Sequence, residues 1–292
     1  MDAEKKGSNY INLSFIPTGS VEVESLLSTA KYIATDYRAR LLPVTLEMLM
    51  FLKHNCRFWD VSHVHEALQL PDKQIKMATA AIKLFKVVIF GATGGTGLEL
   101  CRQAAEAGHT VTAYVRSPEK LAIKHPNIVC VKGTLEDAAA VEAAVRDKDA
   151  VLVALGSRSL LTRDTACSAG TRVILDAMKN TGVRRIVVCS SFGVGPDNRK
   201  LVPWFLRILL YNALIDKDDQ EADIQKSDVD WIIARPVGLV DEPARGNIHV
   251  EPSGSIPVPC LRISRADVAA FMLGQLEDRT YVHKTPTLCW SV

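Results

Sequence analysis

From residue 84 onward, short apolar runs alternate with stretches in which apolar residues recur at the spacing of a helix. The apolar runs, such as VVIF, VLVAL and RIVVC, are rich in valine and isoleucine. Continuous runs of this kind are typical of parallel strands that are covered by helices on both faces. The alternation therefore predicts an α/β fold with a doubly wound parallel sheet over residues 84–292. The expected strands and helices are 86–91, 96–108, 109–116, 127–133, 136–147, 149–156, 165–182, 184–191 and 229–236.

The residues before this domain lack the alternation. Residues 1–20 are polar and unpatterned, and we expect them to be disordered. Residues 21–60 contain a helix candidate that begins at Pro43, and its body, VTLEMLMFLKH, is apolar almost all the way round. Residues 61–83 are expected to form a linker. The domain is thus predicted to follow a short N-terminal extension that is mainly helical or disordered.

A glycine-rich turn joins the first expected strand to the first expected helix of the domain. The stretch GATGGTG places glycines at the spacing G-x-x-G-x-x-G. Gly91 allows a tight turn, Gly94 and Gly95 let the backbone approach a diphosphate, and Gly97 lets the helix pack close to the sheet. The free amides of the helix and the hydroxyls of neighbouring threonines then face the phosphates. This context favours dinucleotide binding over a purely structural turn, through Gly91, Thr93, Gly94, Gly95, Thr96 and Gly97.

The second expected strand ends in Arg116, where sites that prefer NAD usually place an acid to bind the ribose hydroxyls. A guanidinium can bind a 2′-phosphate through two hydrogen bonds, whereas an acid would repel it. Ser117 and Lys120 lie within reach of the same group. The sequence therefore favours NADPH over NADH as cofactor. The alternative is that Arg116 is an ordinary surface cation.

The remaining strand ends supply further candidates, because the carboxyl ends of parallel strands meet at one crevice. The segment GTLED is expected beside the adenine, LGSR beside the phosphates and ribose, CSS near the nicotinamide, and ARP at the far edge. Ser190 and Ser191 could instead be strand-end caps. The residues singled out in these segments are Thr134, Leu135, Leu155, Gly156, Arg158, Cys189, Ser190, Ser191 and Pro236.

Composition and charge narrow the list of partners and compartments. The 292 residues carry a net charge of +2, which is too small to favour nucleic acid or a membrane surface as the main partner. The seven cysteines form no C-x-x-C pair, and neither a signal peptide nor a membrane span is evident, so we expect a cytoplasmic protein. The segment HVHE (63–66) could suggest a metal site, but it lacks further ligands and is interpreted as a solvated turn. No metal is predicted.

The motifs GATGGTG, LGSR, CSSFG, the stretch DKDDQEADIQKSDVDWIIARPVGL and ISRADVA together resemble the atypical short-chain dehydrogenase/reductase superfamily. Within its NAD(P)H-binding, NmrA-like branch, the chain is most similar to the biliverdin IX beta reductase/flavin reductase family. The resemblance implies a Rossmann-like fold and NADPH-dependent reduction of a flavin, quinone or open-chain tetrapyrrole. It also implies NADP contacts from Gly91, Thr93, Gly94, Thr96, Arg116, Lys120, Leu155, Gly156 and Arg158, with Ser190 and Ser191 near the nicotinamide and substrate.

Three departures from that family concern the substrate side. Thr134 stands where the family has an aspartate, and Ala266 stands where it has a histidine. The segment Leu201–Ile215 is more apolar than in those reductases. This segment could cover a flat aromatic substrate, or it could be a core or interface helix; the sequence leaves both open.

No tyrosine of this chain is followed by a lysine four residues later, so the acid–base pair of many short-chain dehydrogenases is missing. We therefore expect a conjugated acceptor, which can take hydride and pick up a proton from solvent, rather than a ketone. Ser191 is the expected catalytic residue, orienting the substrate or relaying a proton. The alternative function is an NmrA-like redox sensor that binds NADP(H) with little or no catalysis.

The extension carries a second resemblance. The segment LLSTAKYIATDYRARLLPVTLEMLMFLKHN (26–55) resembles the C-terminal dimerisation segment of hAT-family transposases. Nothing similar to the catalytic acidic core of that family is present, so DNA transposition is not predicted. The resemblance implies a fused remnant over residues 21–60 that could promote self-association, and a scaffold that binds partners through it is a third hypothesis.

Overall fold

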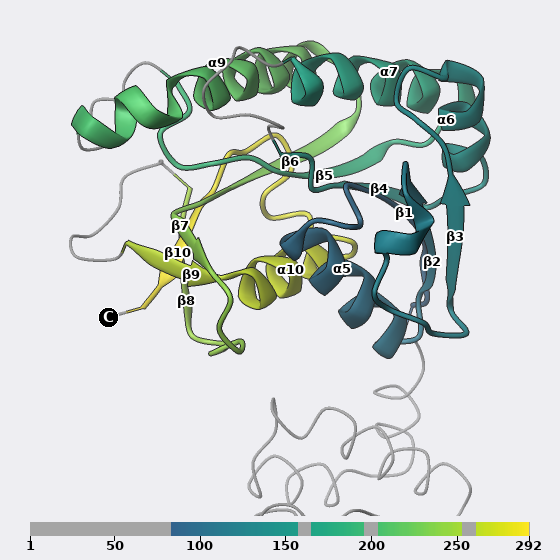
Figure 1. Ribbon diagram of the computed structural model, residues 1–292, viewed down its shortest axis with the longest axis horizontal. Coiled ribbons are helices and arrows are strands. Elements are labelled where there is room, and N and C mark those ends of the chain that lie inside the picture. The colour runs from purple at the N-terminus through teal and green to yellow at the C-terminus, as the bar shows by residue number, and fades with distance from the viewer. Residues whose placement is uncertain (1–82, 157–164, 196–203, 253–260, 292) are drawn as a thin grey trace, which may run out of the picture. The chain divides into compact units, whose positions relative to one another are not determined.

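A computed structural model describes residues 83–156, 165–195, 204–252 and 261–291, and Leu84–Val292 forms one compact unit (Figure 1). The predicted disordered segment, the transposase-like segment, the linker and the HVHE segment all lie outside the described residues, as does Arg158.

Ten strands and six helices are described in this unit. The strands are β1 (Lys86–Phe90), β2 (Thr110–Val115), β3 (Ile128–Lys132), β4 (Ala150–Val153), β5 (Arg185–Cys189), β6 (Asp230–Pro236), β7 (Gly238–Val240), β8 (Ile248–Glu251), β9 (Arg262–Ser264) and β10 (Thr287–Trp290). The helices are α5 (Gly95–Glu106), the 3-10 helix η2 (Pro118–Lys120), α6 (Ala138–Val145), α7 (Ala166–Thr181), α9 (Trp204–Lys226) and α10 (Arg265–Gly274).

Eight of these strands form one twisted, mainly parallel sheet in the order β3-β2-β1-β4-β5-β6-β10-β8. Strands β1 to β6 and β10 pair in parallel, as the continuous apolar runs predict, whereas β8 pairs with β10 in antiparallel fashion. Strands β7 and β9 form a separate two-stranded sheet. The prediction of a Rossmann-like α/β fold is confirmed.

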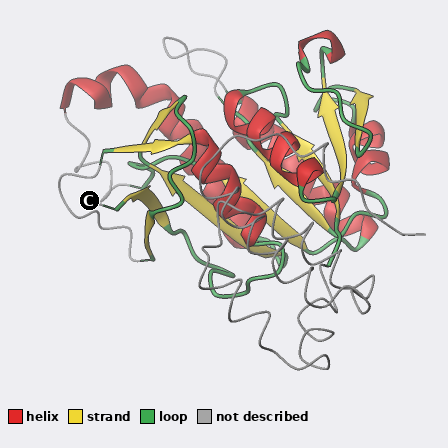
Figure 2. Cartoon of the chain, turned by 90° about the horizontal axis from the view of Figure 1, so that it is seen from below, coloured by secondary structure: helices red, strands yellow, loops and turns green. Residues whose placement is uncertain are grey.

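Helices cover both faces of the sheet. Figure 1 shows α6, α7 and α9 on one face and α5 and α10 on the other, and Figure 2 shows from below how helices lie against the strands. Successive residues of β1 alternate between the two cores: Val87 and Ile89 pack on the α5–α10 side, and Val88 and Phe90 pack on the α6–α7 side. Burying each such side chain contributes about 1.5–3 kcal/mol relative to leaving it exposed. This two-sided burial explains why the strand reads as an uninterrupted apolar run.

Polar side chains fix the ends of the helices next to the crevice. The Asp137 carboxylate accepts a hydrogen bond from the Ala140 amide and caps α6. The buried Asp216 carboxylate of α9 accepts from the amides of Cys167 and Ser168 at 2.9 and 3.0 Å, so that one helix caps the start of α7 from a distance in sequence. Such a carboxylate also faces the positive end of the α7 dipole.

Candidate functional site

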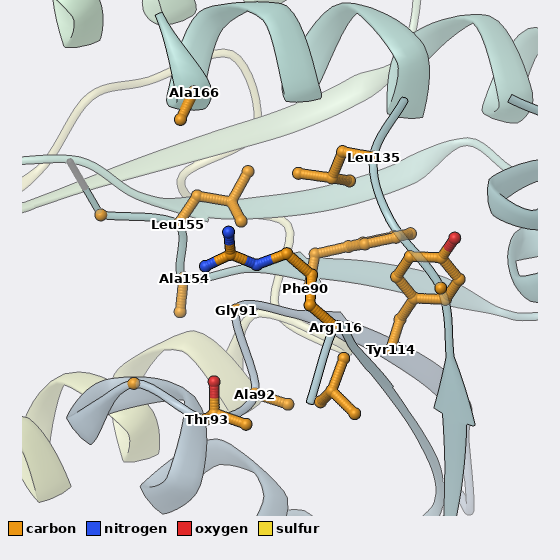
Figure 3. Close-up of a pocket in the computed structure, with 14 residues that line it drawn as sticks. Phe90, Gly91, Ala92, Thr93, Tyr114, Arg116, Leu135, Ala154, Leu155 and Ala166 are labelled. Atoms are coloured by element: carbon orange, nitrogen blue, oxygen red, sulfur yellow. The ribbon is translucent and has the colours of Figure 1, made fainter. Parts of the chain in front are cut away.

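The strand order reverses at β1, which pairs with β2 on one side and β4 on the other. At such a switch point the connections leave in opposite directions and open a crevice at the carboxyl ends of the strands. A pocket of about 270 Å³ lies there (Figure 3). Seven residues that the sequence assigned to dinucleotide binding line it: Gly91, Thr93, Gly94, Arg116, Leu135, Leu155 and Gly156.

The glycine turn has the backbone geometry that a diphosphate requires. Gly91 has a φ of +80°, and a Cβ on it would collide with the carbonyl of Ala154. A Cβ on Gly97 would collide with the Gly91 carbonyl, so the helix can come this close to the turn only with glycine. The Gly94 amide donates to the Gly91 carbonyl at 3.0 Å and closes the turn. A side chain at Gly91 or Gly97 would therefore collide with the backbone of the turn. This lack of side chains fits the close approach of a diphosphate that the sequence predicts.

The first turn of α5 supplies amides at this point. Its first hydrogen bond of helical type runs from the Leu98 amide to the Gly94 carbonyl at 2.8 Å. The amides of Gly95, Thr96 and Gly97 precede that bond, and such amides have no partner within their own helix. These three residues do not line the pocket; they form the helix end beside it, and Thr96 is buried.

Arg116 follows β2 directly and is exposed, and Figure 3 shows its guanidinium turned over the pocket. Among the described residues that line this pocket, it carries the only charge. Ser117 immediately precedes the 3-10 helix η2 and Lys120 ends it, and neither residue lines the pocket. A pocket with one guanidinium and no carboxylate in its described lining favours an anionic ligand.

Sequence reasoning missed Tyr114, which lines the pocket from the end of β2 and lies against Phe90, with ring centroids 5.2 Å apart. The Tyr114 hydroxyl donates to the Thr134 carbonyl at 2.9 Å, and burial raises its pKa. A Cβ on Gly133 would collide with the Tyr114 ring. The signal in the sequence was an aromatic residue two positions before Arg116, near the end of the second expected strand.

The second half of the crevice, at the ends of β5 and β6, is built from side chains. The Ser190 hydroxyl is buried and donates to Glu221 at 2.5 Å. Glu221 in turn binds Arg235 through both carboxylate oxygens, and the two charged side chains are only 3% and 11% exposed. Ser190 is therefore tied into a buried network beneath the strand ends.

The other predicted residues of this half lie near that network. The Ser191 hydroxyl is half-buried and donates to the Phe192 carbonyl at 3.1 Å. Cys189 is buried, and burial raises the pKa of its thiol. Pro236 is buried at the end of β6, where its carbonyl accepts from the Phe192 amide at 2.8 Å. None of these residues lines the pocket described above.

Lys217 is a second residue that sequence reasoning missed. Its ammonium group projects from α9 and donates to the carbonyls of Leu155 and Cys189 at 3.2 and 3.0 Å, and to the Gln220 side chain at 3.3 Å. It therefore joins the ends of β4 and β5 beside the crevice. In the sequence it stands within the charged run DKDDQE, which is typical of a solvated helix face and gives no signal of this position.

The structure places two of the positions at which the sequence departs from the reductase family it resembles. Ala266 is buried where α10 meets α5, and its carbonyl accepts from the Gln103 side chain at 2.9 Å. The apolar segment Leu201–Ile215 is described only from residue 204 onward, as the start of α9. There Leu214 is buried and Tyr211 is 53% exposed.

Within the described ranges, no group of histidine, cysteine or acidic residues could hold a metal ion. The helices of these same ranges include none with the length and apolar character needed to cross a bilayer.

Comparison with known proteins gives a family and a set of relatives. A family model described as NAD(P)H-binding matches residues 91–279. An uncharacterised chloroplast protein of Arabidopsis thaliana is 32% identical over 190 residues, which cover 61% of this chain and 68% of that protein. A (4-alkanoyl-5-oxo-2,5-dihydrofuran-3-yl)methyl phosphate reductase of Streptomyces griseus is 27% identical over 213 residues, 68% of each chain.

Solved structures share the fold. The oxidoreductase ylbE from Lactococcus lactis superposes with a TM-score of 0.62 at 21% identity, covering 70% of this chain and 91% of that one. ChuY, an anaerobillin reductase from Escherichia coli O157:H7, has a TM-score of 0.60 at 24% identity and covers 70% and 96%. The glycine turn, the switch-point pocket and the family match over most of the domain agree, and this chain belongs to the NAD(P)H-binding family.

Proposed function

We propose that this protein is an NADPH-dependent reductase of the atypical short-chain dehydrogenase type. It would transfer hydride to a conjugated acceptor such as a flavin, a quinone or a biliverdin-like tetrapyrrole. The observation that carries the proposal is the switch-point pocket, which combines a side-chain-free diphosphate turn with Arg116 as the charged residue of its described lining.

The choice of NADPH follows from charge. The adenosine 2′-phosphate would meet the Arg116 guanidinium at the end of β2, with Lys120 one short helix farther along. NAD would leave that cation without its anion, and the described pocket lining offers no carboxylate for the ribose hydroxyls. The diphosphate would lie on the amides of the glycine turn, and Tyr114 and Leu135 would bound the adenine end.

The type of acceptor follows from the acid–base groups that the chain offers. Lys217 lies at the strand ends, but the residue four positions before it is Ala213, so no tyrosine is paired with it in the manner of ketone-reducing relatives. The nicotinamide supplies the hydride, and the protein supplies orientation and electrostatics. Conjugated acceptors can take their proton from solvent, with the Ser191 hydroxyl as the group that orients them.

The activities of two relatives support a reductase. They are the furanone phosphate reductase of Streptomyces griseus, described above, and a probable pinoresinol-lariciresinol reductase of Arabidopsis thaliana that is 28% identical over 123 residues. Their acceptors differ from one another, so they support the reaction class rather than a particular substrate.

Arg116→Asp tests the cofactor. We expect affinity for NADPH to fall by about tenfold to a hundredfold, as for loss of hydrogen bonds to a charged group, and affinity for NADH to stay the same or rise. Titration with NADPH and, separately, with NADH, followed by the fluorescence of the reduced nicotinamide, measures the two affinities. Lys124→Asp is a matched control, because it makes the same change of charge at an exposed position in the segment that follows η2. Equal losses for NADPH and NADH would contradict the phosphate role of Arg116.

An acceptor screen tests the reaction. The full chain is mixed with NADPH and, separately, with FMN, dichlorophenolindophenol or biliverdin, and oxidation is followed at the NADPH absorbance band. We expect oxidation that depends on the acceptor and is faster with NADPH than with NADH. Absence of any NADPH binding would overturn the whole proposal.

A redox sensor is the second candidate function, and one observation favours it. The Ser190 hydroxyl is held by the buried Glu221 carboxylate rather than presented at the crevice. Tight NADPH binding without oxidation by any acceptor in the screen would favour the sensor over the reductase.

A further inference from the structure

Arg265, the first residue of α10, lies across the first residue of α5. A Cβ added to Gly95 would stand 2.6 Å from the Cδ atom of Arg265 and 2.8 Å from its Nε atom. The arginine therefore takes the space that a side chain at position 95 would need. The sequence explained Gly95 by the approach of a diphosphate, and the structure adds a second reason: Gly95 makes room for a cation at the diphosphate turn.

The guanidinium of Arg265 has a weak partner. Its Nη1 atom binds the Asp241 carboxylate at 2.7 Å, and this is the only hydrogen bond or ion pair that the described residues give it. The Asp241 side chain is 83% exposed and that of Arg265 is 27% exposed. Because ion pairs at exposed positions contribute little free energy, a ligand anion can displace Asp241 readily.

The loop that carries Asp241 is held in place a few residues later. The buried Asp267 carboxylate of α10 accepts hydrogen bonds from the backbone amides of Arg245 and Gly246 at 2.9 to 3.1 Å. The same helix therefore carries Arg265 and anchors the loop that supplies its partner. Asp241 lies on the exposed part of that loop, so a ligand can replace its carboxylate at Arg265 without unfolding the loop.

Positive charge converges on the end of β5 from both faces of the sheet. Burial raises the pKa of the Cys189 thiol at the end of β5, and the charges of Lys217 and Arg265 oppose that rise, which places both cations near this strand end. Lys217 comes from α9 and Arg265 from α10, and these helices cover opposite faces of the sheet (Figure 1). The amides that begin α5 lie beside Arg265.

We propose that Arg265 binds the diphosphate of the nicotinamide cofactor, exchanging the Asp241 carboxylate for phosphate oxygens. The diphosphate is then held between the amides of the glycine turn and a guanidinium, whose planar fork suits phosphate oxygens. Asp241 competes with the cofactor for Arg265 in the free protein. This inference rests on the cofactor site proposed above and adds a binding residue from outside the glycine motif.

Four ligands distinguish the role of Arg265 from that of Arg116. Each ligand is titrated into the full chain, and its affinity is measured by calorimetry. NADPH carries both the diphosphate and the 2′-phosphate, NADH and ADP-ribose carry only the diphosphate, and 2′-AMP carries only the 2′-phosphate. We expect Arg265→Gln to weaken NADPH, NADH and ADP-ribose by about tenfold or more and to leave 2′-AMP unchanged. Arg116→Gln should give the opposite pattern, weakening NADPH and 2′-AMP only.

Asp241→Asn provides a gain-of-affinity test that does not depend on a damaged site. Removing the competing carboxylate should tighten ADP-ribose by about twofold to fivefold, and the gain should shrink as salt screens the exposed pair. In the double variant with Arg265→Gln this gain should vanish. A gain that persists without Arg265 would contradict the exchange.

The outcomes distinguish this inference from the function it rests on. Failure of the wild-type chain to bind any of the four ligands overturns the cofactor site itself. Normal binding by wild type, with ADP-ribose bound equally well by Arg265→Gln, overturns the role of Arg265 alone. A raised KM for the acceptor with unchanged ADP-ribose affinity would also overturn it and assign Arg265 to the substrate. Thermal unfolding of each variant confirms that it is folded.

Discussion

The two halves of the crevice are built by different means. The half at the ends of β1 to β4 is shaped by backbone: glycines at 91 and 97 permit a turn that any side chain would block. The half at the ends of β5 and β6 is shaped by side chains, in which Glu221 joins Ser190 to Arg235 and Lys217 joins two strand ends. The first arrangement is local in sequence, and the second unites residues from separate elements.

This difference determines which kind of substitution each half of the crevice can tolerate. A site shaped by backbone depends on glycines, which have no side chain. Almost any substitution there adds atoms that collide with the neighbouring backbone. A side-chain-built site depends on satisfied polar partners, so its weakness is the loss of one member that leaves another buried without a partner. We expect the first half to fail by steric overlap and the second by unpaired charge.

Glu221→Gln should have the largest effect on stability. It leaves the Arg235 cation, 11% exposed, without its charged partner, and breaking a buried ion pair typically costs about 3–5 kcal/mol. Urea unfolding measures the change in the free energy of unfolding. Because Glu221 does not line the pocket, affinity of the folded variant for 2′,5′-ADP, which represents the adenosine half of NADPH, should remain as in wild type.

Asp228→Asn is the matched control for this substitution. It makes the same acid-to-amide change in an exposed pair with Arg184, where the Asp228 side chain is 82% exposed, and should cost less than about 1 kcal/mol. If the two substitutions cost the same, the Ser190–Glu221–Arg235 network does not stabilise the second half as described.

Gly97→Ala should have the next largest effect and should act on the other half. The added methyl group would stand 2.1 Å from the Gly91 carbonyl oxygen, and an overlap this severe should cost about 3 kcal/mol, the upper end of the usual range for overpacking. Here 2′,5′-ADP binding should weaken together with stability, because the turn itself must move. Gly274→Ala is the control, since a Cβ at that helical position meets nothing within 4 Å. Unchanged 2′,5′-ADP affinity in Gly97→Ala would remove the distinction between the halves.

Asp267→Asn should have a smaller effect that depends on pH. Burial pushes the pKa of Asp267 upward, but hydrogen bonds from Trp290, the Arg245 amide, Ser264 and the Gly246 amide outweigh burial and hold it below its usual range. A carboxyl whose folded pKa is depressed stabilises the protein above its unfolded pKa of about 3.9, and that contribution is lost as pH falls through the folded pKa. We expect the variant to be less stable by about 2 kcal/mol at pH 7.

Unfolding of wild type and Asp267→Asn measured from pH 7 to about pH 3 checks this expectation. The gap between them should be constant near neutrality and should narrow below about pH 4 as the wild-type carboxyl takes up its proton. A gap of equal size across the whole range would mean that the charge of Asp267 is not what stabilises the loop after β7.

The sequence predicted the sheet because its signals are local. Strands such as Lys86–Phe90 and Arg185–Cys189 are buried on both faces and read as continuous apolar runs, and the glycine spacing predicted the turn at the end of β1. Strands β7 to β10 were not predicted. Strands β7 and β9 lie outside the main sheet and β8 lies at its edge, whereas β10 lies between β6 and β8 but is an apolar run of only four residues.

The side-chain-built half was predicted only in part for the same reason. Ser190 and Ser191 were placed at a strand end, but their partners were not, since Glu221 lies 31 positions from Ser190 in the sequence. Lys217 stands in a charged run of α9 that is typical of a solvated helix face, and Arg265 is the first residue of the mostly buried helix α10. Their positions depend on how α9 and α10 pack on the sheet, which no spacing within either segment encodes.

The contact between Tyr114 and Gly133 constrains how this end of the pocket can diverge. The tyrosine hydroxyl binds the main-chain carbonyl of residue 134, so the identity of that residue's side chain is not what holds the loop. Positions 114 and 133, in contrast, share one volume: a larger residue at 133 demands a smaller one at 114. In a library of functional variants, substitutions at positions 114 and 133 should therefore occur together, whereas position 134 should vary independently of them.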